Sequence, residues 1–430
     1  MAHIGVGGFH RAHMALYTHE LATDGCDWGI GGVGVLPADA RMAEALRAQD
    51  HLYTLVERGT GEPRVTVIGS IIDYHLVAGD LAAGATLCAD PGLAILSLTV
   101  TEAGYDSPSA TFDMIAAGLE QRRADRAGPL SILSCDNLSS NGDAARQATL
   151  TAAAARSESL ARWVEENCSF PNSMVDRITP VTSSEDQAWL ADRCGIEDRW
   201  PVVAEPFRQW VMEDVFAAGR PRWEDVGVLF TVDVRAWELY KLRLLNAGHS
   251  SMAYLSALAG LTHVDEAMTV PEVRRFLDDL LYREAVPSLS EIPGHPRDRY
   301  ADSVLERFAN TGVRDQIARL CIDGTAKFPT FLIPTVAHHL ARGGPVERSA
   351  LALAGWARYL AVVPVEEQAF DASGDVARAH ARGAVDDPLR FLLFEEVFPP
   401  AVRDHHGFRL AFRDASRRIA ELGPLAAMGG

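Results

Sequence analysis

Ile4-Gly5-Val6-Gly7-Gly8-Phe9-His10 is the stretch that decides the fold of the first part of this chain. It follows a short apolar run, predicted to be a strand, and opens a segment with helical periodicity. Glycines between a strand and a helix let the backbone approach a pyrophosphate, and the helix N-terminus favours its charge. The stretch therefore predicts a dinucleotide-binding loop, with its three glycines and Phe9 against the cofactor. His10 stands where such loops usually have a third glycine, so a plain tight turn is the alternative.

Strands and helices alternate after this loop. Apolar runs at 30–36, 53–57, 65–72, 93–100 and 130–134 predict strands, and segments at 11–23, 38–49 and 111–123 predict helices. Such alternation predicts a parallel sheet flanked by helices. Beyond about residue 234, helical periodicity takes over, at 237–261, 271–283, 299–308, 313–320, 331–341 and 349–360. We therefore expect an α/β fold, with a Rossmann-type domain over residues 1–231 and a mostly α-helical C-terminal domain over 232–430.

Composition narrows the classes of function. The formal net charge of −18 would repel nucleic acid, so no nucleic-acid partner is expected. No apolar run reaches 18 residues, and the N-terminus lacks a secretory pattern, so we expect a cytoplasmic protein with no membrane partner. The six cysteines show no C-x-x-C spacing, and Cys and His do not cluster at zinc spacing. Neither a disulfide scaffold nor a metal site is predicted.

Polar side chains follow three of the predicted strands. Asp39 comes after the strand at 30–36, Thr101 and Glu102 follow the strand at 93–100, and Asn137 follows the strand at 130–134. In doubly wound sheets, ligands bind beyond the carboxyl ends of the strands. We therefore expect these residues to face the cofactor, with Asp39 on the adenosine ribose, where its charge would disfavour NADP. The alternatives are a helix N-terminal acid for Asp39 and a turn residue for Asn137.

A second informative stretch, Lys241-Leu-Arg-Leu-Leu-Asn-Ala-Gly-His249, carries an amine, an amide and an imidazole. Apolar neighbours would desolvate Lys241 and lower its pKa toward that of a general base, although a solvated lysine is the commoner case. At about 100° per residue, Glu238, Lys241 and His249 share one side of a helix, but Asn246 lies about 140° from Lys241. Asn246 joins them only if the helix is irregular or the cleft wraps around it. We expect the active site in the cleft between the two domains.

The chain as a whole resembles the polyol-specific long-chain dehydrogenase family, that of mannitol 2-dehydrogenase and fructuronate reductase. The resemblance runs from Ile4 to the C-terminal region. The segments that carry it are 4–13, 99–105, 134–138, 174–180, 241–249 and 323–329. Val-Asp-Arg-Ile-Thr-Pro at 175–180 and the Lys…Asn…His stretch are specific, whereas the glycine loop is widespread.

The resemblance implies metal-free, NAD(H)-dependent interconversion of a polyol and a ketose, or of the uronate equivalent. It also implies a role for each matching residue. These are Lys241 as general base, Asn137 and Asn246 as oxyanion hole, His249 as substrate-binding residue, Glu238 as proton relay, Asp176, Arg319 and Lys327 as substrate-binding residues, and Asp39 as the ribose-binding acid.

Three functions remain open at this point. The first is a mannitol 2-dehydrogenase type of enzyme acting on D-mannitol and D-fructose, with no partner beyond its small polyol or ketose, as a monomer. The second is a hexuronate reductase acting on D-fructuronate or D-tagaturonate, in which Arg319 or Lys327 would meet the substrate carboxylate. The third is a catalytically silent NAD-binding sensor, which the intact Lys…Asn…His set disfavours.

Overall fold

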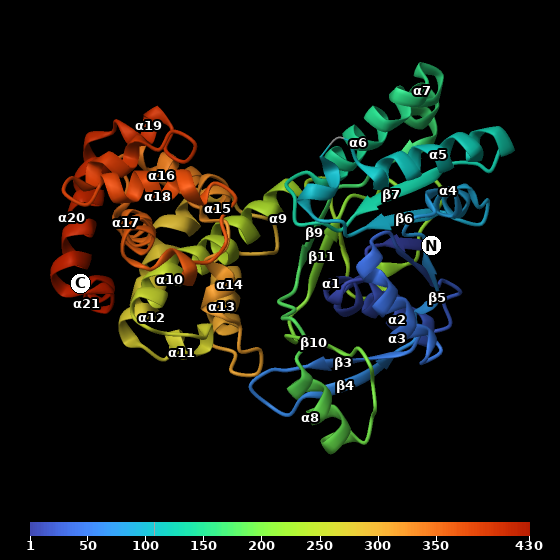
Figure 1. Cartoon of the computed structure of the whole chain (residues 1–430), viewed down its shortest axis with the longest axis horizontal. Helices are drawn as coiled ribbons and strands as arrows, with labels where there is room; N and C mark the ends of the chain where they lie inside the picture. The colour runs from blue at the N-terminus through green and yellow to red at the C-terminus, as the bar shows by residue number, and fades with distance from the viewer. Residues whose placement is uncertain (107) are drawn as a thin grey trace. The chain divides into compact units, whose positions relative to one another are not determined.

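The computed structural model describes residues 1–106 and 108–430, which form two compact units, Met1–Arg235 and Ala236–Gly430 (Figure 1). The first unit is α/β and the second is helical, so the predicted fold class is confirmed. The sequence predicts the domain boundary after residue 231, and in the structure the first unit ends at Arg235. Among the residues described, no helix is long and apolar enough to cross a membrane.

A six-stranded parallel sheet forms the centre of the first unit, in the order β5-β2-β1-β6-β7-β8. Its strands are β1 (Ala2–Ile4), β2 (Ile30–Gly34), β5 (Ile71–Leu76), β6 (Ile95–Leu98), β7 (Leu130–Ser134) and β8 (Cys168–Ser169). The chain runs outward from β1 to β2 and β5, then continues on the other side of β1 at β6. This reversal sets the carboxyl ends of β1 and β6 side by side, which is where ligands of doubly wound sheets bind.

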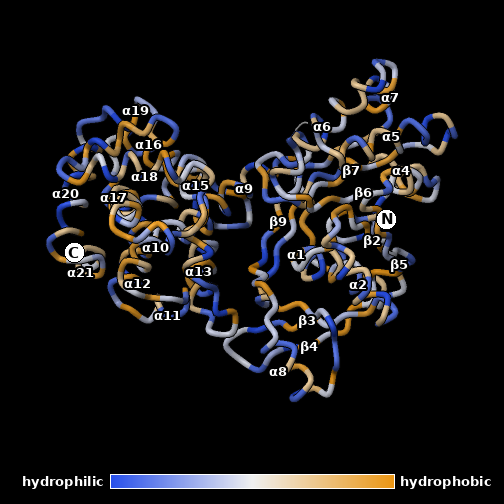
Figure 2. The backbone as a smooth tube through the Cα atoms, viewed as in Figure 1, coloured by the Kyte–Doolittle hydropathy of each residue, from blue (hydrophilic) through white to orange (hydrophobic). Residues whose placement is uncertain are grey.

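The central strands β1, β6 and β7 are buried throughout, because helices cover both faces of the sheet there; β6 and β7 are mostly hydrophobic in Figure 2. Leu96 and Leu98 pack in one core with α5 and α6, whereas Ile95 packs with residues of α2 in another. The helix predicted over 11–23 is divided at His13, where φ is −124° and ψ is −93°. The helices are α1 (Gly8–Ala12), α2 (Met14–Thr23), α3 (Ala40–Arg47), α4 (Leu81–Ala89), α5 (Ala110–Asp125), α6 (Asn141–Arg156), α7 (Glu158–Asn167) and α8 (Ser184–Cys194).

Two smaller sheets complete the first unit. One consists of β10 (Val202–Ala204), β3 (Tyr53–Glu57) and β4 (Arg64–Ile68), and the other of β12 (Leu229–Phe230), β11 (Gln209–Met212) and β9 (Ser173–Asp176). The single strand predicted over 65–72 is wrong, because β4 ends at Ile68 and β5 begins at Ile71 in a different sheet. Ser70 fixes this transition by donating a hydrogen bond from Oγ to Ala15 O at 2.6 Å.

The second unit packs its helices around α10, whose residues 247–256 are all buried, and α17. The helix predicted over 313–320 is shorter than expected, because Arg314 adopts a left-handed φ of 51° and α14 begins only at Ile317. The helices are α9 (Arg235–Tyr240), α10 (Ala247–Leu258), α11 (Val264–Met268), α12 (Pro271–Asp279), α13 (Arg297–Phe308), α14 (Ile317–Leu320), α15 (Gly324–Phe331), α16 (Ile333–Leu340), α17 (Glu347–Val362), α18 (Gly374–Gly383), α19 (Pro400–Arg403), α20 (His406–Leu422) and α21 (Pro424–Gly429).

Two π-helical turns interrupt helices that the sequence predicts as regular. The turn η4 (Lys241–Asn246) joins α9 to α10, and η5 (Leu280–Ala285) continues α12. The two turns contact each other. Arg243 of η4 also donates from Nη1 to the carbonyl oxygen of Ser288 at 2.6 Å, just beyond η5. The segment that carries Lys241 is therefore held against a second irregular segment.

Candidate active site

The glycine loop lies at the carboxyl end of β1, against the residue that follows β6. Gly5 has a φ of +89°, and a Cβ there would lie 2.0 Å from the carbonyl oxygen of Thr99, so only glycine fits. A Cβ on Gly7 would meet nothing nearer than Gly5 O at 4.0 Å, so the backbone at Gly7 is open to a ligand. Gly8 begins α1, and Phe9 is half-buried with its ring stacked on His13 at 4.9 Å.

A hydrogen-bonded network of side chains from β1 and from the end of β6 holds this loop in place. His3 contacts Ser97 Oγ through Nδ1 at 2.8 Å and Thr99 Oγ1 through Nε2 at 2.6 Å, and Thr99 Oγ1 donates to Gly5 O at 2.6 Å. The ring of His10 stacks on His3, with centroids 3.5 Å apart. Burial lowers the pKa of His3 to about 3 and the pKa of His10 well below its usual value, so both rings are neutral. His10 therefore replaces the expected glycine by packing inward.

Asp39 lies in a 3-10 turn, η1 (Pro37–Asp39), directly after β2. Its Oδ2 accepts a hydrogen bond from the backbone nitrogen of Leu36 at 2.9 Å, which holds the carboxylate at the strand end. A Cβ on Gly34 would lie 2.7 Å from the Cβ of Asp39, so this glycine makes room for the acid. The carboxylate is partly exposed and close enough to Tyr74 to help burial raise the pKa of that phenol.

The loops after β6 and β7 are joined by Asp136, a residue that the sequence pattern does not single out. Its carboxylate accepts hydrogen bonds from Thr101 N at 2.8 Å, Val100 N at 3.2 Å and the Tyr105 hydroxyl at 2.7 Å. These bonds hold Thr101 at a strained φ of +63°, which costs a β-branched residue about 1–2 kcal/mol. Burial raises the pKa of Asp136, and the hydrogen bonds oppose that shift.

The two loops present the remaining predicted residues of the sheet edge. Glu102 begins the 3-10 turn η2 (Glu102–Tyr105) and is exposed. Asn137 directly follows Asp136 and is exposed as well. The network around Asp136 therefore sets Thr101, Glu102 and Asn137 at one edge of the sheet.

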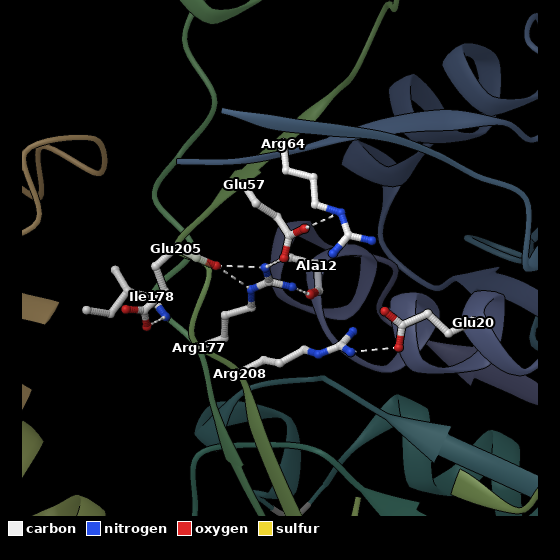
Figure 3. A network of polar contacts seen from close by, with 8 residues as sticks. All are labelled: Ala12, Glu20, Glu57, Arg64, Arg177, Ile178, Glu205 and Arg208. Carbon is white, nitrogen blue, oxygen red and sulfur yellow. Dashed lines mark hydrogen bonds and ion pairs between the residues drawn. The ribbon is translucent and has the colours of Figure 1, made fainter. Parts of the chain in front are cut away.

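Asp176 ends β9 and is buried, and the next residue, Arg177, ties this strand end to three other segments (Figure 3). Arg177 donates from Nε and Nη2 to Glu205 O at 2.9 and 2.7 Å, pairs with Glu57 at 2.5 Å, and donates from Nη1 to Ala12 O. Ala12 ends the helix that the glycine loop opens. One buried guanidinium thus links that loop to the strand carrying Asp176, and a hydrogen-bond partner on each of its three nitrogens offsets the cost of burying the charge.

The π-helical turn η4 changes the relation between Lys241 and Asn246. A regular helix would place residues five apart about 140° from each other. In a π-helix the repeating hydrogen bond runs from i to i+5, so residues five apart lie roughly one above the other. Both side chains are partly buried, with the fully buried Leu244 and Leu245 between them. The irregular helix, one of the two conditions set by the sequence, is therefore present.

His249 follows in α10 and is neutral. Its ring stacks on Phe308 with centroids 4.0 Å apart, and burial lowers its pKa to about 3. Its Nε2 is buried without a hydrogen-bond partner among the residues described. A buried ring nitrogen of this kind is suited to a polar ligand group. Glu238, one turn before Lys241, is buried in α9.

Arg319 and Lys327 lie close enough to His249 to act on its charge. Arg319, in α14, donates from Nε to Asp315 Oδ1 at 2.8 Å and from Nη2 to Asp315 Oδ2. Lys327, in α15, donates from Nζ to Leu320 O at 3.2 Å. Around the imidazole of His249, the second unit therefore gathers the guanidinium groups of Arg307 and Arg319, the amine of Lys327 and the carboxylate of Asp315.

Each unit thus collects its own share of the predicted residues. The sequence pattern does not predict a role for the buried charged residues Asp136, Arg177 and Asp315. Their only signal in the sequence is position: Asp136 and Arg177 adjoin Asn137 and Asp176, and Asp315 lies four residues before Arg319. Among residues 1–106 and 108–430, no three His, Cys, Asp or Glu side chains gather in a way that could hold a metal ion. The first unit holds Gly5, Gly7, Gly8, Phe9, Asp39, Thr101, Glu102, Asn137 and Asp176, and the second holds Glu238, Lys241, Asn246, His249, Arg319 and Lys327.

A Rossmann-type α/β unit followed by a helical unit with a Lys-Asn-His set defines a class of two-domain, nucleotide-binding proteins. Comparison with known families makes the class specific. The mannitol dehydrogenase Rossmann domain matches residues 1–225, and the mannitol dehydrogenase C-terminal domain matches residues 233–420. The chain belongs to the mannitol dehydrogenase family.

Individual relatives cover the whole chain. A mannitol dehydrogenase of Saccharomyces cerevisiae is 38% identical over 100% of this chain and 91% of its own length. A mannitol 2-dehydrogenase of Aspergillus fumigatus is 38% identical over 98% and 91%. Among solved structures, Pseudomonas fluorescens mannitol 2-dehydrogenase, in a ternary complex with NAD and D-mannitol, superposes with a TM-score of 0.89 at 38% identity, covering 99% of this chain and 93% of that one. A substrate-free D-sorbitol dehydrogenase gives a TM-score of 0.89 at 35% identity, covering 99% and 94%.

Proposed function

We propose that the protein is a metal-independent, NAD(H)-dependent oxidoreductase that interconverts a polyol and a ketose, with D-mannitol and D-fructose as its first candidates. The π-helical turn η4 carries this proposal, because it gives a lysine and an asparagine five residues apart a common side. Membership of the mannitol dehydrogenase family and the relatives named above support the same reaction class.

In this proposal Lys241 is the general base of polyol oxidation. A neutral amine accepts the proton of the substrate hydroxyl, and the protonated amine returns it when a ketose is reduced. Glu238, in the turn before Lys241, passes that proton onward to solvent. Negative charge develops on the substrate oxygen as its proton leaves. The amide groups of Asn137 and Asn246 donate to that oxygen, which stabilises the transition state more than the neutral ground state.

The remaining polar residues bind the sugar chain. The open nitrogen of neutral His249 suits a substrate hydroxyl. The carboxylate of Asp176 accepts hydrogen bonds from hydroxyls, while Arg319 and Lys327 donate to them. Acceptors and donors together match a substrate that carries several neutral hydroxyl groups.

The glycine loop suits a nicotinamide dinucleotide, which supplies the hydride acceptor when it is bound. Gly7 has open backbone at the carboxyl end of β1, next to the end of β6. Phe9, Thr101 and Glu102 would line the same edge of the sheet. Asp39 after β2 would accept the ribose hydroxyls, and its negative charge favours NAD over the 2′-phosphate of NADP.

Hexuronate reduction is a second candidate function. Arg307, Arg319 and Lys327 all act on His249 with positive charge. Such a field would attract the carboxylate of D-fructuronate or D-tagaturonate. The same cations also serve neutral sugars by donating hydrogen bonds, so this observation permits both substrates.

A substrate panel tests the proposed function. Purified protein is mixed with NADH or NADPH and with D-fructose, D-xylulose, D-fructuronate or D-tagaturonate, and the loss of absorbance at the nicotinamide band is followed. We expect NADH oxidation with D-fructose, and the reverse reaction with D-mannitol and NAD. Turnover restricted to the two uronates would replace the first candidate by the second, and turnover with NADPH alone would remove the role given to Asp39.

A further inference from the structure

The side chain of Arg319 is not evenly available to a ligand, because Asp315 occupies one of its edges. Nε donates to Asp315 Oδ1 at 2.8 Å and Nη2 donates to Oδ2 of the same carboxylate. This two-bond geometry is the one by which arginine recognises a carboxylate. Asp315 therefore already fills the position that a carboxylate of a substrate would take on this edge.

The backbone, rather than the arginine, sets the position of Asp315. Arg314 has a φ of 51°, a left-handed conformation that an arginine adopts only under constraint. The carbonyl oxygen of Asp315 accepts a hydrogen bond from Val264 N at 2.9 Å, and Ile317 N donates to Thr262 O at 3.0 Å. The side chain of Asp315 is 6% exposed, while that of Arg319 is 50% exposed. A fixed, buried carboxylate thus orients a more exposed guanidinium.

Asp315 also supplies the negative charge beside His249. It acts on the His249 ring with a sign opposite to that of Arg319, Arg307 and Lys327. Removal of Asp315 would leave these three cations around the imidazole and would release the Nε–Nη2 edge of Arg319. Both changes favour an anionic ligand over a neutral one.

We propose that Asp315 is the positioning residue that makes this side of the site select neutral sugars over hexuronates. It holds Arg319 by the edge that could chelate a carboxylate, and its own charge repels an anion. A neutral hydroxyl is unaffected by that charge and can accept a hydrogen bond from the rest of the guanidinium. This inference rests on the proposed function, in which Arg319 binds substrate, and adds the residue that decides between its two candidate substrates.

The test compares D-fructose with D-fructuronate in wild type, Asp315→Asn, Arg319→Ala and the double variant, with NADH saturating. In Asp315→Asn we expect the KM for D-fructose to rise about three- to tenfold with little change in kcat. We expect kcat/KM for D-fructuronate, relative to D-fructose, to rise at least about tenfold. If Asp315 acts through Arg319, the double variant binds D-fructose no more weakly than Arg319→Ala alone.

Asp278→Asn is the matched control. Asp278 pairs with Arg274 four residues apart in α12, at 3.1 Å and partly exposed, so this variant removes an ion pair of the same type elsewhere in the unit. It should leave both KM values and their ratio unchanged. A similar shift in the control would mean that the effect of Asp315→Asn is not local.

The results that would contradict the role of Asp315 differ from those that would contradict the proposed function. An unchanged substrate ratio in Asp315→Asn, or additive losses in the double variant, would overturn the role of Asp315. An Arg319→Ala variant with an unaltered KM for every sugar would remove Arg319 from the substrate site and so contradict the proposed function instead. If Asp315→Asn does not fold, Asp315→Glu carries the test, because it keeps the charge but alters the geometry. It should raise the KM for D-fructose while keeping the discrimination, and lost discrimination would contradict the proposal.

Discussion

The glycine loop of the first unit and the π-helical turn of the second unit both carry candidate site residues, but their geometry has different origins. Gly5, Asp39, Thr101 and Asn137 each follow a strand of one parallel sheet, so the order of the strands alone brings them to one edge. Lys241 and Asn246 share a side only because η4 departs from regular helical geometry. The first arrangement follows from topology, and the second depends on a local irregularity.

The largest expected effect separates the chemistry of the second unit from the cofactor binding of the first. Lys241→Ala removes the general base, so kcat for D-mannitol oxidation should fall about 10³- to 10⁴-fold. The dissociation constant for NADH, measured by fluorescence titration, should change less than about twofold, because the glycine loop is untouched. Unchanged turnover would contradict the general-base assignment, and lost NADH binding would mean that the two functions are not divided between the units.

Asn246→Ala tests whether the π-helical turn matters for catalysis. Loss of one donor to the developing oxyanion should lower kcat about 10²- to 10³-fold, with KM nearly unchanged. Asn141→Ala is no suitable control, because Asn141 is buried and bonded to Asp136 O and Ser173. Asn167→Ala in α7 is better, since its partly exposed side chain donates to Trp163 O at 2.9 Å within its own helix. Equal losses in Asn246→Ala and Asn167→Ala would deny Asn246 a place in the site.

Gly5→Ala tests the glycine loop of the first unit. The added Cβ would lie 2.0 Å from Thr99 O at a φ of +89°, so the loop must move. We expect NADH binding to weaken about ten- to a hundredfold. Gly25→Ala is the matched control, because Gly25 has a φ of +90° but nothing within 4 Å of a Cβ. If both variants bind NADH alike, the close approach of Gly5 to Thr99 is not what shapes the cofactor loop.

Acid should weaken the two regions unequally. In the first unit His3 and His13 have pKa values of about 3 and His10 is lowered as well, chiefly by burial. The unfolded chain takes up protons on them below pH 6.5 while the fold does not, so stability falls as the pH drops from 6.5 toward 3. Each contributes about 1.4 kcal/mol per pH unit, and the raised pKa of Asp136 offsets a part.

In the second unit two shifts of opposite sign balance. Protonation of His249 destabilises the fold in the same way as that of the other histidines. Burial raises the pKa of Glu284 to about 7, so its protonation increases the free energy of unfolding as the pH falls from 7 toward 4.5. Hydrogen exchange at pH 7.5 and 5.5, corrected for intrinsic rates, should show lost protection in β1 and β6 and little loss in α10. The reverse order would contradict this assignment of the buried charges.

The smallest expected effect is that of a chelator. Because asparagine amides and a lysine are proposed to handle the developing charge, EDTA should leave kcat unchanged. Strong inhibition that zinc reverses would show that a metal takes part, and would remove the need for the oxyanion hole proposed around Asn137 and Asn246.

The features that follow from sheet topology could be predicted from the sequence. Alternating apolar runs indicated the parallel sheet, and polar residues directly after those runs indicated its ligand-binding edge. The features that could not be predicted are those in which the backbone passes from one element to another within a mostly apolar stretch. Residues 65–72 are mostly apolar on both sides of Gly69 and Ser70, yet these two residues carry the chain from one sheet to another. The turn at Arg314 and the buried partner Asp315 are likewise invisible, because a left-handed arginine has no signature in the sequence.

The turn at Lys241–Asn246 also has a consequence for the engineering of this protein. A π-turn amounts to one residue more than a regular helical turn contains. Deleting a single leucine among residues 242–245 would leave Lys241 and the asparagine four residues apart in a regular helix, about 40° from each other, so both would keep a common side without the π-turn. Such a shortened variant would separate the contribution of the π-turn itself from that of the common side which it gives the two residues.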